Sequence, residues 1–174
     1  SNFQDFLYGN DGADRILGGA GDDWIEGGLG NDYMDGGAGS FDMVTFGRAT
    51  NAVVVDLAIT VAQNTRVGFD TILNFEWLGG SNFNDILRGN AGDNYIFGGL
   101  GNDRLEGRDG NDRIQDNGGD DIILGGAGND DIDVSINGGG GVWGEQAMAA
   151  HPQIPLSEAK DMADYILSLK DKDV

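Results

Sequence analysis

The sequence has no cysteine among its 174 residues and only a small number of basic side chains. Without cysteine there are no disulfide bonds, no thiolate metal sites and no thioether attachment of haem. The 10 lysines and arginines face 30 acidic residues, which leaves a net charge of −20. Nucleic-acid phosphates need basic contacts and anionic membranes repel acidic surfaces, so both classes of partner are disfavoured. The partner that suits this charge is a cation.

Long apolar runs are absent as well. The sequence has no stretch of about 18 apolar residues, so we expect no membrane span. The N-terminal residues show no basic-then-apolar signal, so classical secretion is not indicated. Because the sequence starts inside a repeat, we expect Ser1 not to be the natural start. A small secreted domain without disulfides usually needs another stabilising element, and bound metal is the obvious candidate.

Glycine is abundant, with 32 residues, against a usual share of about 7%. Flexible backbone combined with charge of one sign is typical of intrinsic disorder. Apolar residues nevertheless recur at a fixed phase, which fits poorly with a disordered chain. We therefore expect a chain that is disordered without a counter-ion and folded with one.

An aspartate or asparagine returns every nine residues in two runs, and an apolar residue follows it two places later. When the carboxylate is numbered as position six of a nonapeptide, positions one, two and four are mostly glycine, as in residues 18–26. A glycine turn, a carboxylate and a short strand at this period predict a calcium-loaded parallel β-solenoid. The position-six residues are Asp5, Asp14, Asp23 and Asp32, then Asp85, Asn94, Asp103, Asp112, Asp121 and Asp130.

Two repeats are expected to make one coil of the solenoid. Residues 18 apart then stack about 4.8 Å from each other, which is the spacing of neighbouring strands. One apolar side chain per repeat points inward, and glycine tolerates the positive φ that the turns require. The inward residues predicted at position eight are Leu7, Ile16, Ile25, Met34, Leu87, Ile96, Leu105, Ile114, Ile123 and Ile132.

This stacking explains the acidic residues. Calcium takes six to eight oxygen ligands and accepts carbonyls as readily as carboxylates, whereas magnesium demands stricter geometry. Without an ion the stacked carboxylates would repel one another. We predict about six calcium ions, which would change the formal charge from −20 to about −8. The predicted pairs are Asp5–Asp23, Asp14–Asp32, Asp85–Asp103, Asn94–Asp112, Asp103–Asp121 and Asp112–Asp130.

The pattern Gly-Gly-x-Gly-x-Asp-x-apolar-x, in residues 27–35, 98–106 and 125–133, resembles the RTX family of haemolysin-type calcium-binding repeats. The resemblance covers residues 1–44 and 80–133 of a module spanning residues 1–133. It implies an all-β fold, a right-handed parallel β-roll, that folds on calcium outside bacterial cells after type I export. It also implies carbonyl ligands at positions one and three of one loop and two and four of the loop 18 residues on. Those carbonyls belong to Asn2, Gly9, Asp11, Gly18, Gly19, Ala20, Gly21, Gly28, Gly30, Gly37, Gly39, Gly80, Asn82, Gly89, Ala91, Gly98, Gly99, Leu100, Gly101, Gly107, Arg108, Asp109, Gly110, Asn117, Gly119, Gly126 and Gly128.

The sequence departs from this pattern in three places. Asn94 replaces an aspartate, so its site loses a charge and is expected to bind calcium more weakly. Arg108 and Asn117 replace glycines at position two, although a carbonyl ligand does not need a particular side chain. One residue is inserted before Asp42, which distorts that loop; Asp42 either closes a site with Asp23 or faces solvent.

A spacer at residues 45–79 abandons the nonapeptide. The segments 43–46, 52–57 and 69–78 are rich in β-branched and aromatic residues and are predicted to be strands. Asp42, Asp56 and Asp70 are 14 residues apart, which is compatible with larger coils of one continuous solenoid. We interpret Asp56 and Asp70 as turn or strand-end residues rather than metal ligands.

Several aromatic residues occupy outward positions of the repeats. They are compatible with a sugar-stacking or partner-docking face. The alternative is that they are ordinary, scattered surface aromatics. The residues concerned are Phe6, Tyr8, Trp24, Tyr33, Tyr95 and Phe97.

Residues 134–174 lack the repeat and form a separate appendage, with a short C-terminal α-helix predicted at residues 156–170. One interpretation is a cap over the open end of the solenoid. The segment also resembles the C-terminal half of a class I c-type cytochrome, in which Met148 matches the methionine that ligates haem iron. No Cys-x-x-Cys-His motif is present, so this chain alone is not expected to hold haem. A haem-bearing half would have to lie elsewhere.

The sequence therefore predicts a calcium-binding RTX module of a secreted bacterial protein that is not itself an enzyme. Its expected partners are calcium and other domains of a larger secreted protein. Two alternatives stay open. One is part of an electron-transfer cytochrome fusion with Met148 as haem ligand, and the other is a carbohydrate- or surface-binding module that uses the outward aromatics.

Overall fold

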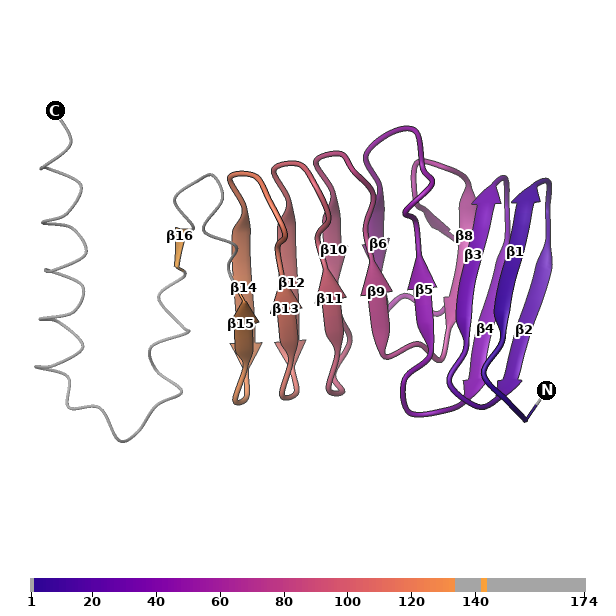
Figure 1. The fold of residues 1–174 in the computed structure, drawn as a ribbon, viewed down its shortest axis with the longest axis horizontal. Coiled ribbons are helices and arrows are strands. Elements are labelled where there is room, and N and C mark those ends of the chain that lie inside the picture. The colour runs from indigo at the N-terminus through magenta and orange to yellow at the C-terminus, as the bar shows by residue number, and fades with distance from the viewer. Residues whose placement is uncertain (1, 134–141, 144–174) are drawn as a thin grey trace, which may run out of the picture.

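The fold is a stack of short β-strands arranged along one long axis, as the computed structural model shows (Figure 1). The structure describes residues 2–133 and 142–143. The predicted C-terminal helix and Met148 lie outside these residues. Within them, no helix is long and apolar enough to cross a membrane.

One face of the stack is a single seven-stranded sheet that passes through the spacer without interruption. All its strand pairs are parallel. In spatial order the strands are β1 (Phe6–Asp11), β3 (Trp24–Leu29), β5 (Met43–Thr45), β9 (Trp77–Gly79), β11 (Tyr95–Phe97), β13 (Arg113–Gln115) and β15 (Asp131–Asp133).

The opposite face is divided into two sheets within the spacer. The antiparallel pairing of β7 with β8 is the exception to the parallel arrangement among the described strands. The first sheet contains β2 (Arg15–Ala20), β4 (Tyr33–Ala38), β8 (Phe69–Leu73) and β7 (Gln63–Asn64). The second contains β6 (Val54–Asp56), β10 (Ile86–Arg88), β12 (Arg104–Asp109), β14 (Ile122–Ala127) and β16 (Val142–Trp143).

The register of the strands confirms the predicted coil of two nonapeptides. Leu7 pairs with Ile25 on the first face, and Leu105 pairs with Ile123 on the second. Each pair is separated by 18 residues, so equivalent positions of alternate repeats lie side by side. The prediction of an all-β parallel solenoid is confirmed for the described residues.

The core is a column of the predicted position-eight residues. Six of them are completely buried: Ile25, Met34, Leu87, Ile96, Leu105 and Ile114. Leu7, Ile16 and Ile132 lie near the ends and are only partly buried. The spacer adds further buried apolar side chains to the same core, among them two phenylalanines. These residues are Phe46, Val53, Val55, Leu57 and Phe75.

The turns between strands require backbone conformations that few residues adopt. Gly30 has a φ of 132°, and an added Cβ there would collide with the carbonyl oxygen of Gly12 on the preceding coil. At position two, Arg108 and Asn117 adopt positive φ values of 81° and 67° without being glycines. Side chains in this region are strained, so these substitutions need local compensation.

Candidate metal centres

The position-six residues form two ladders along the solenoid. In each, a backbone N–H donates to one side-chain oxygen of the equivalent residue on the next coil, as from Asp5 to Asp23 Oδ1 at 2.9 Å. The first ladder follows the loops that lead into the seven-stranded sheet, in two segments: Asp5, Asp23, Asp42 and Glu76, then Asn94, Asp112 and Asp130. Between the segments, the side-chain amide of Asn94 donates to the backbone carbonyl of Glu76 at 3.2 Å. The second follows the loops on the other side, in two segments: Asp14, Asp32 and Asp70, then Asp85, Asp103 and Asp121.

The other carboxylate oxygen of most ladder residues is buried without a hydrogen-bond partner. Leaving a buried charged oxygen unsatisfied is costly, and seven such atoms recur at one repeat position. An oxygen-seeking cation between the loops would satisfy them. The seven atoms are the Oδ2 oxygens of Asp14, Asp23, Asp32, Asp42, Asp103, Asp112 and Asp121.

Backbone carbonyls line the same spaces between loops. The position-two and position-four carbonyls of each loop face the loop that follows: Asn10 O points at Gly28, and Gly12 O points at Gly30. The position-one carbonyl faces the loop that precedes, as Gly27 O does toward Gly9. This arrangement is the reverse of the order that the family resemblance implied. Predicted carbonyl groups that lie against a neighbouring loop are those of Gly19, Gly21, Gly30, Gly98, Gly101, Gly107, Arg108 and Gly110.

These oxygens fit a calcium ion better than other metals. Among the described residues, no three His, Asp or Glu side chains gather closely enough to hold a metal by themselves. A site here must therefore combine carboxylates with carbonyls, which is the ligand set that calcium accepts. Except beside Asn94, each space between ladder residues offers two carboxylates and several carbonyls, all hard oxygen donors.

The stacked carboxylates are electrostatically strained without a cation. Burial, together with the charges of Asp85 and Asp121 on neighbouring coils, raises the pKa of Asp103 to about 7. Burial, together with the charge of Asp130, raises the pKa of Asp112 to about 6. A carboxyl that resists ionisation in the empty fold is stabilised as a carboxylate by a bound cation. Binding of a cation between the loops would therefore stabilise the ionised form of the ladder carboxylates.

Asp42 joins the first ladder despite the residue inserted before it. Its Oδ1 accepts a hydrogen bond from the N–H of Asp23 at 2.7 Å, and its Oδ2 is one of the seven unsatisfied oxygens. The insertion changes the sequence separation from 18 to 19, and the loop absorbs the extra residue. The structure therefore brings Asp42 and Asp23 together, which is the arrangement that the first alternative, a site closed by these two residues, requires.

Two ladder residues are not predicted by the nonapeptide pattern. Asp70 Oδ1 accepts a hydrogen bond from the N–H of Asp32 at 2.8 Å. Asp70 is therefore a member of the second ladder and not only a turn or strand-end residue. Glu76 Oε2 accepts the N–H of Asp42 at 3.1 Å. The signal was present in the order acid-x-apolar at 70–72 and 76–78, although most glycines are missing. Asp56, by contrast, is on neither ladder.

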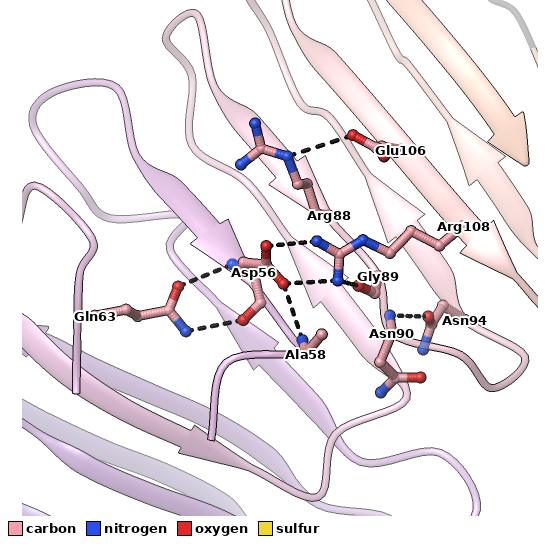
Figure 2. Close-up of polar contacts among 9 residues, drawn as sticks. All are labelled: Asp56, Ala58, Gln63, Arg88, Gly89, Asn90, Asn94, Glu106 and Arg108. Carbon is pink, nitrogen blue, oxygen red and sulfur yellow. Dashed lines mark hydrogen bonds and ion pairs between the residues drawn. The ribbon is translucent and has the colours of Figure 1, made fainter. Parts of the chain in front are cut away.

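In three loops the chain itself satisfies the oxygen that is orphaned elsewhere. Ser81 donates its N–H to Asp85 Oδ2 at 2.6 Å, and its hydroxyl also contacts that carboxylate. The N–H of Asn90 donates to Asn94 Oδ1 at 2.7 Å (Figure 2). The hydroxyl of Thr65 donates to Asp70 Oδ2. These three loops, all in the middle of the chain, are less dependent on a cation than the others.

In this central region the side chain of Arg108, rather than a bound ion, provides a positive charge (Figure 2). Its guanidinium donates to both carboxylate oxygens of Asp56, at 2.8 and 2.6 Å, and to the carbonyl of Gly89 at 2.9 Å. The carbonyl of Gly89 was predicted to bind calcium, but in the structure it accepts a hydrogen bond from the guanidinium of Arg108. Gln63 holds Asp56 from the other side through two hydrogen bonds to its backbone, both of 2.9 Å. The ion pair compensates for the strained φ of Arg108.

The outward aromatic residues gather in groups on the seven-stranded sheet. Phe6 and Trp24 stack with ring centres 6.1 Å apart. Trp77 contacts Tyr95 at 4.8 Å and also packs against Phe41. Between Trp24 and Trp77 lies an open cleft, whose other walls are Gln4, Asp22, Asp23, Phe41 and Met43. The predicted aromatic Tyr33 lies apart on the opposite face, beneath Arg15.

Comparison with known families identifies the repeats. The model of the RTX calcium-binding nonapeptide repeat matches four times, at residues 8–40, 79–114, 98–132 and 106–142, which together make up more than half of the chain. Residues 41–78 lie outside these matches. None of the curated proteins compared with the chain matches it. The matched family gives no support to the cytochrome resemblance of residues 134–174, and Met148 lies outside the described residues.

Proposed function

Because this chain belongs to the RTX calcium-binding nonapeptide repeat family, we propose that it is a non-catalytic module of a secreted bacterial protein that folds when calcium binds. Its role would be to stabilise and present the domains attached to it. Family membership supports calcium binding, and a fold made of glycine loops and carboxylate ladders supports the dependence on ions. Secretion follows from what is typical of the family.

The observation that carries the proposal is the set of seven buried carboxylate oxygens without a partner. A folded protein rarely leaves such groups unsatisfied, and these recur at one position of successive coils. Hydrogen bonds within the chain satisfy one oxygen of each carboxylate and leave the other facing the carbonyls of the adjacent loop. The residues present therefore fit calcium.

The residues that would hold an ion can be named for one representative space. Between the loops that end in Asp103 and Asp121, the ligands would be Asp103 Oδ2, Asp121 Oδ1 and the carbonyl of Gly101. When bound, calcium would neutralise both carboxylates and cross-link two coils. Because the unfolded chain has no such cage, the binding free energy becomes folding free energy. Surroundings poor in calcium would then keep the chain unfolded.

Calcium titration followed by circular dichroism tests the proposal. In chelator at pH 8 we expect a spectrum without strand signal, and on addition of calcium at the same pH a cooperative rise of strand signal. Magnesium at the same concentration should be much less effective, because it demands octahedral geometry and keeps its waters. A strand spectrum that is complete in chelator and unchanged by calcium would show that folding does not depend on the ion.

A second function is favoured by the cleft between Trp24 and Trp77. Aromatic faces with carboxylate and amide groups beside them suit the apolar faces and hydroxyls of a sugar ring. Asp22 and Gln4 supply such polar groups at the cleft. Binding to a glycan array that is abolished by Trp77→Ala, and retained by Tyr33→Ala on the opposite face, would support it. Equal binding by the two variants would exclude this cleft as the sugar site.

A further inference from the structure

We propose that residues 65–70 of the spacer, together with the loop at residues 27–32, form a further calcium site. The inference rests on the proposed calcium-binding function, but one of the two loops, residues 65–70, lies outside every matched repeat. The segment 65–73 reads Thr-Arg-Val-Gly-Phe-Asp-Thr-Ile-Leu, which keeps only the fourth-position glycine, the aspartate and the apolar residue of the nonapeptide.

The backbone of this segment is that of a nonapeptide loop. Arg66, at position two, has a φ of 73°, close to the 71° of Asn10 at the same position of an authentic repeat. At position four, an added Cβ on Gly68 would collide with Gly30 O, just as one on Gly30 would collide with Gly12 O. The spacer therefore places a cryptic repeat directly on the coil that precedes it.

The strand that follows continues the stack. The N–H of Thr71 donates to Asp32 O at 2.8 Å, the same distance as the bond from Tyr33 to Asp14 O one coil earlier. Ile72 pairs with Met34 and is buried, so it takes the inward position eight. The carboxyl group of Asp70 is consequently held over the loop of Asp32 in the same way as one repeat over another.

Four oxygens face the space between these two loops. Asp32 is 2% exposed, and its Oδ2 has no hydrogen-bond partner. Asp70 Oδ1 receives the N–H of Asp32 at 2.8 Å. The carbonyl of Gly30 points at Gly68, and Val67 O accepts the N–H of Gly30 at 3.1 Å. Two carboxylates and two carbonyls form a hard-oxygen set that suits calcium.

The orphaned oxygen of Asp32 distinguishes this space from its central neighbours. In the loops of Asp85 and Asn94 the equivalent oxygen is already hydrogen-bonded within its own loop. Asp32 has no such bond. The Thr65 hydroxyl satisfies Asp70 Oδ2, so Asp70 is fixed with only its Oδ1 turned toward Asp32. Asp70 thereby ends this segment of the second ladder.

The site lacks one ligand of a regular repeat. The position-one carbonyl, that of Thr65, accepts the N–H of Val54 at 3.2 Å, whereas regular loops turn this carbonyl toward the preceding coil. Because calcium affinity depends on the number of protein ligands, this site fills at higher calcium concentration than the site of Asp103 and Asp121. It joins the first repeat block to the spacer.

Two measurements on the whole chain test the inference. Native mass spectrometry in saturating calcium should show one ion fewer for Asp70→Ala, which removes both side-chain oxygens, than for the unaltered protein. Asp131→Ala removes the same group from an exposed side chain on the outer face and should leave the ion count unchanged. An unchanged count for a folded Asp70→Ala would overturn the site.

Crystals of the unaltered protein grown with Tb³⁺ provide a test that does not depend on the folding of a variant. We expect an anomalous peak between Asp32 and Asp70 in addition to peaks in the repeat blocks. Peaks between Asp103 and Asp121 without one between Asp32 and Asp70 would refute this inference alone. A complete absence of peaks would instead contradict the proposed function.

Discussion

Asp56 and Arg108 lie 52 residues apart in the sequence and are joined by two hydrogen bonds of 2.8 and 2.6 Å. The pair connects the spacer strand β6 to strand β12 of the second repeat block, with β10 between them. It is a cross-link that needs no metal. The consequence is that the spacer and the second block are held together even where calcium is absent from the loop of Asn94.

Replacement of Arg108 by glycine should show how much this ion pair contributes to the free energy of unfolding. Glycine relieves the strained φ of 81° but removes the guanidinium from Asp56, and a charge-assisted bidentate contact of this kind contributes about 1–2 kcal/mol. We expect Arg108→Gly to lower the free energy of unfolding in urea at saturating calcium. Asn117→Gly, at the same repeat position, should be neutral or stabilising. Equal effects of the two variants would show that the ion pair does not contribute.

The raised pKa values predict that acid favours the calcium-free fold. The pKa of Asp103 is about 7 in the folded chain, against about 3.9 for an unperturbed aspartate. The stability contributed by such a group is fully present below the unfolded pKa and is lost as the pH rises toward 7. In chelator, circular dichroism should therefore show more strand at pH 4.5 than at pH 8. A calcium-free strand signal that grows with pH would contradict this.

Asn94→Asp should make the first ladder more dependent on calcium. It adds a carboxylate between the loops of Asp112 and Glu76, where like charges repel without an ion. We expect a lower calcium midpoint of folding, because the site gains a charged ligand. Asn102→Asp introduces the same charge at an exposed position of the next loop and should leave the midpoint almost unchanged. If both variants shift it equally, net charge rather than the ladder is responsible.

Gly30→Ala should strongly destabilise the solenoid. The residue has a φ of 132°, and its new Cβ would collide with the backbone of Gly12. Strain and overlap of this kind cost on the order of 1–3 kcal/mol or more. Gly47→Ala is the matched control, because the nearest side-chain atom to its Cβ would be 3.6 Å away. Thermal unfolding in calcium should show a clear fall in Tm for the first variant only.

The nine-residue period was sufficient to predict the coil, the inward column and most of the ladders. Ile25 and Leu105 are buried where the pattern placed them, because one apolar residue per repeat can point inward only at position eight. The pairing of Asp103 with Asp121 follows from the same period. Local spacing determines these features, so a single sequence reveals them.

The remaining features depend on tertiary arrangement. The sequence pattern does not reveal Asp70, because its loop lacks two of the expected glycines: Thr65 and Arg66 stand at positions one and two, where glycine is usual. The contact of Arg108 with Asp56 crosses 52 residues of chain, and no periodicity predicts it. The direction in which each carbonyl faces also depends on the backbone of the folded turn rather than on residue type.

In the ladder aspartates that have an orphaned Oδ2 and a coil before them, the Oδ1 side of the carboxylate is turned to that coil and the Oδ2 is left for an ion held with the coil after. Neighbouring ions therefore share a ligand, and the loss of one ion loosens the next in line. We therefore expect calcium binding to be cooperative along each of the two ladders, with the cooperativity interrupted in the middle of each ladder. The interruptions fall at Asp85 and Asn94, where Ser81 and Asn90 already satisfy the second oxygen. A disturbance that begins in one repeat block should accordingly stop before it reaches the other.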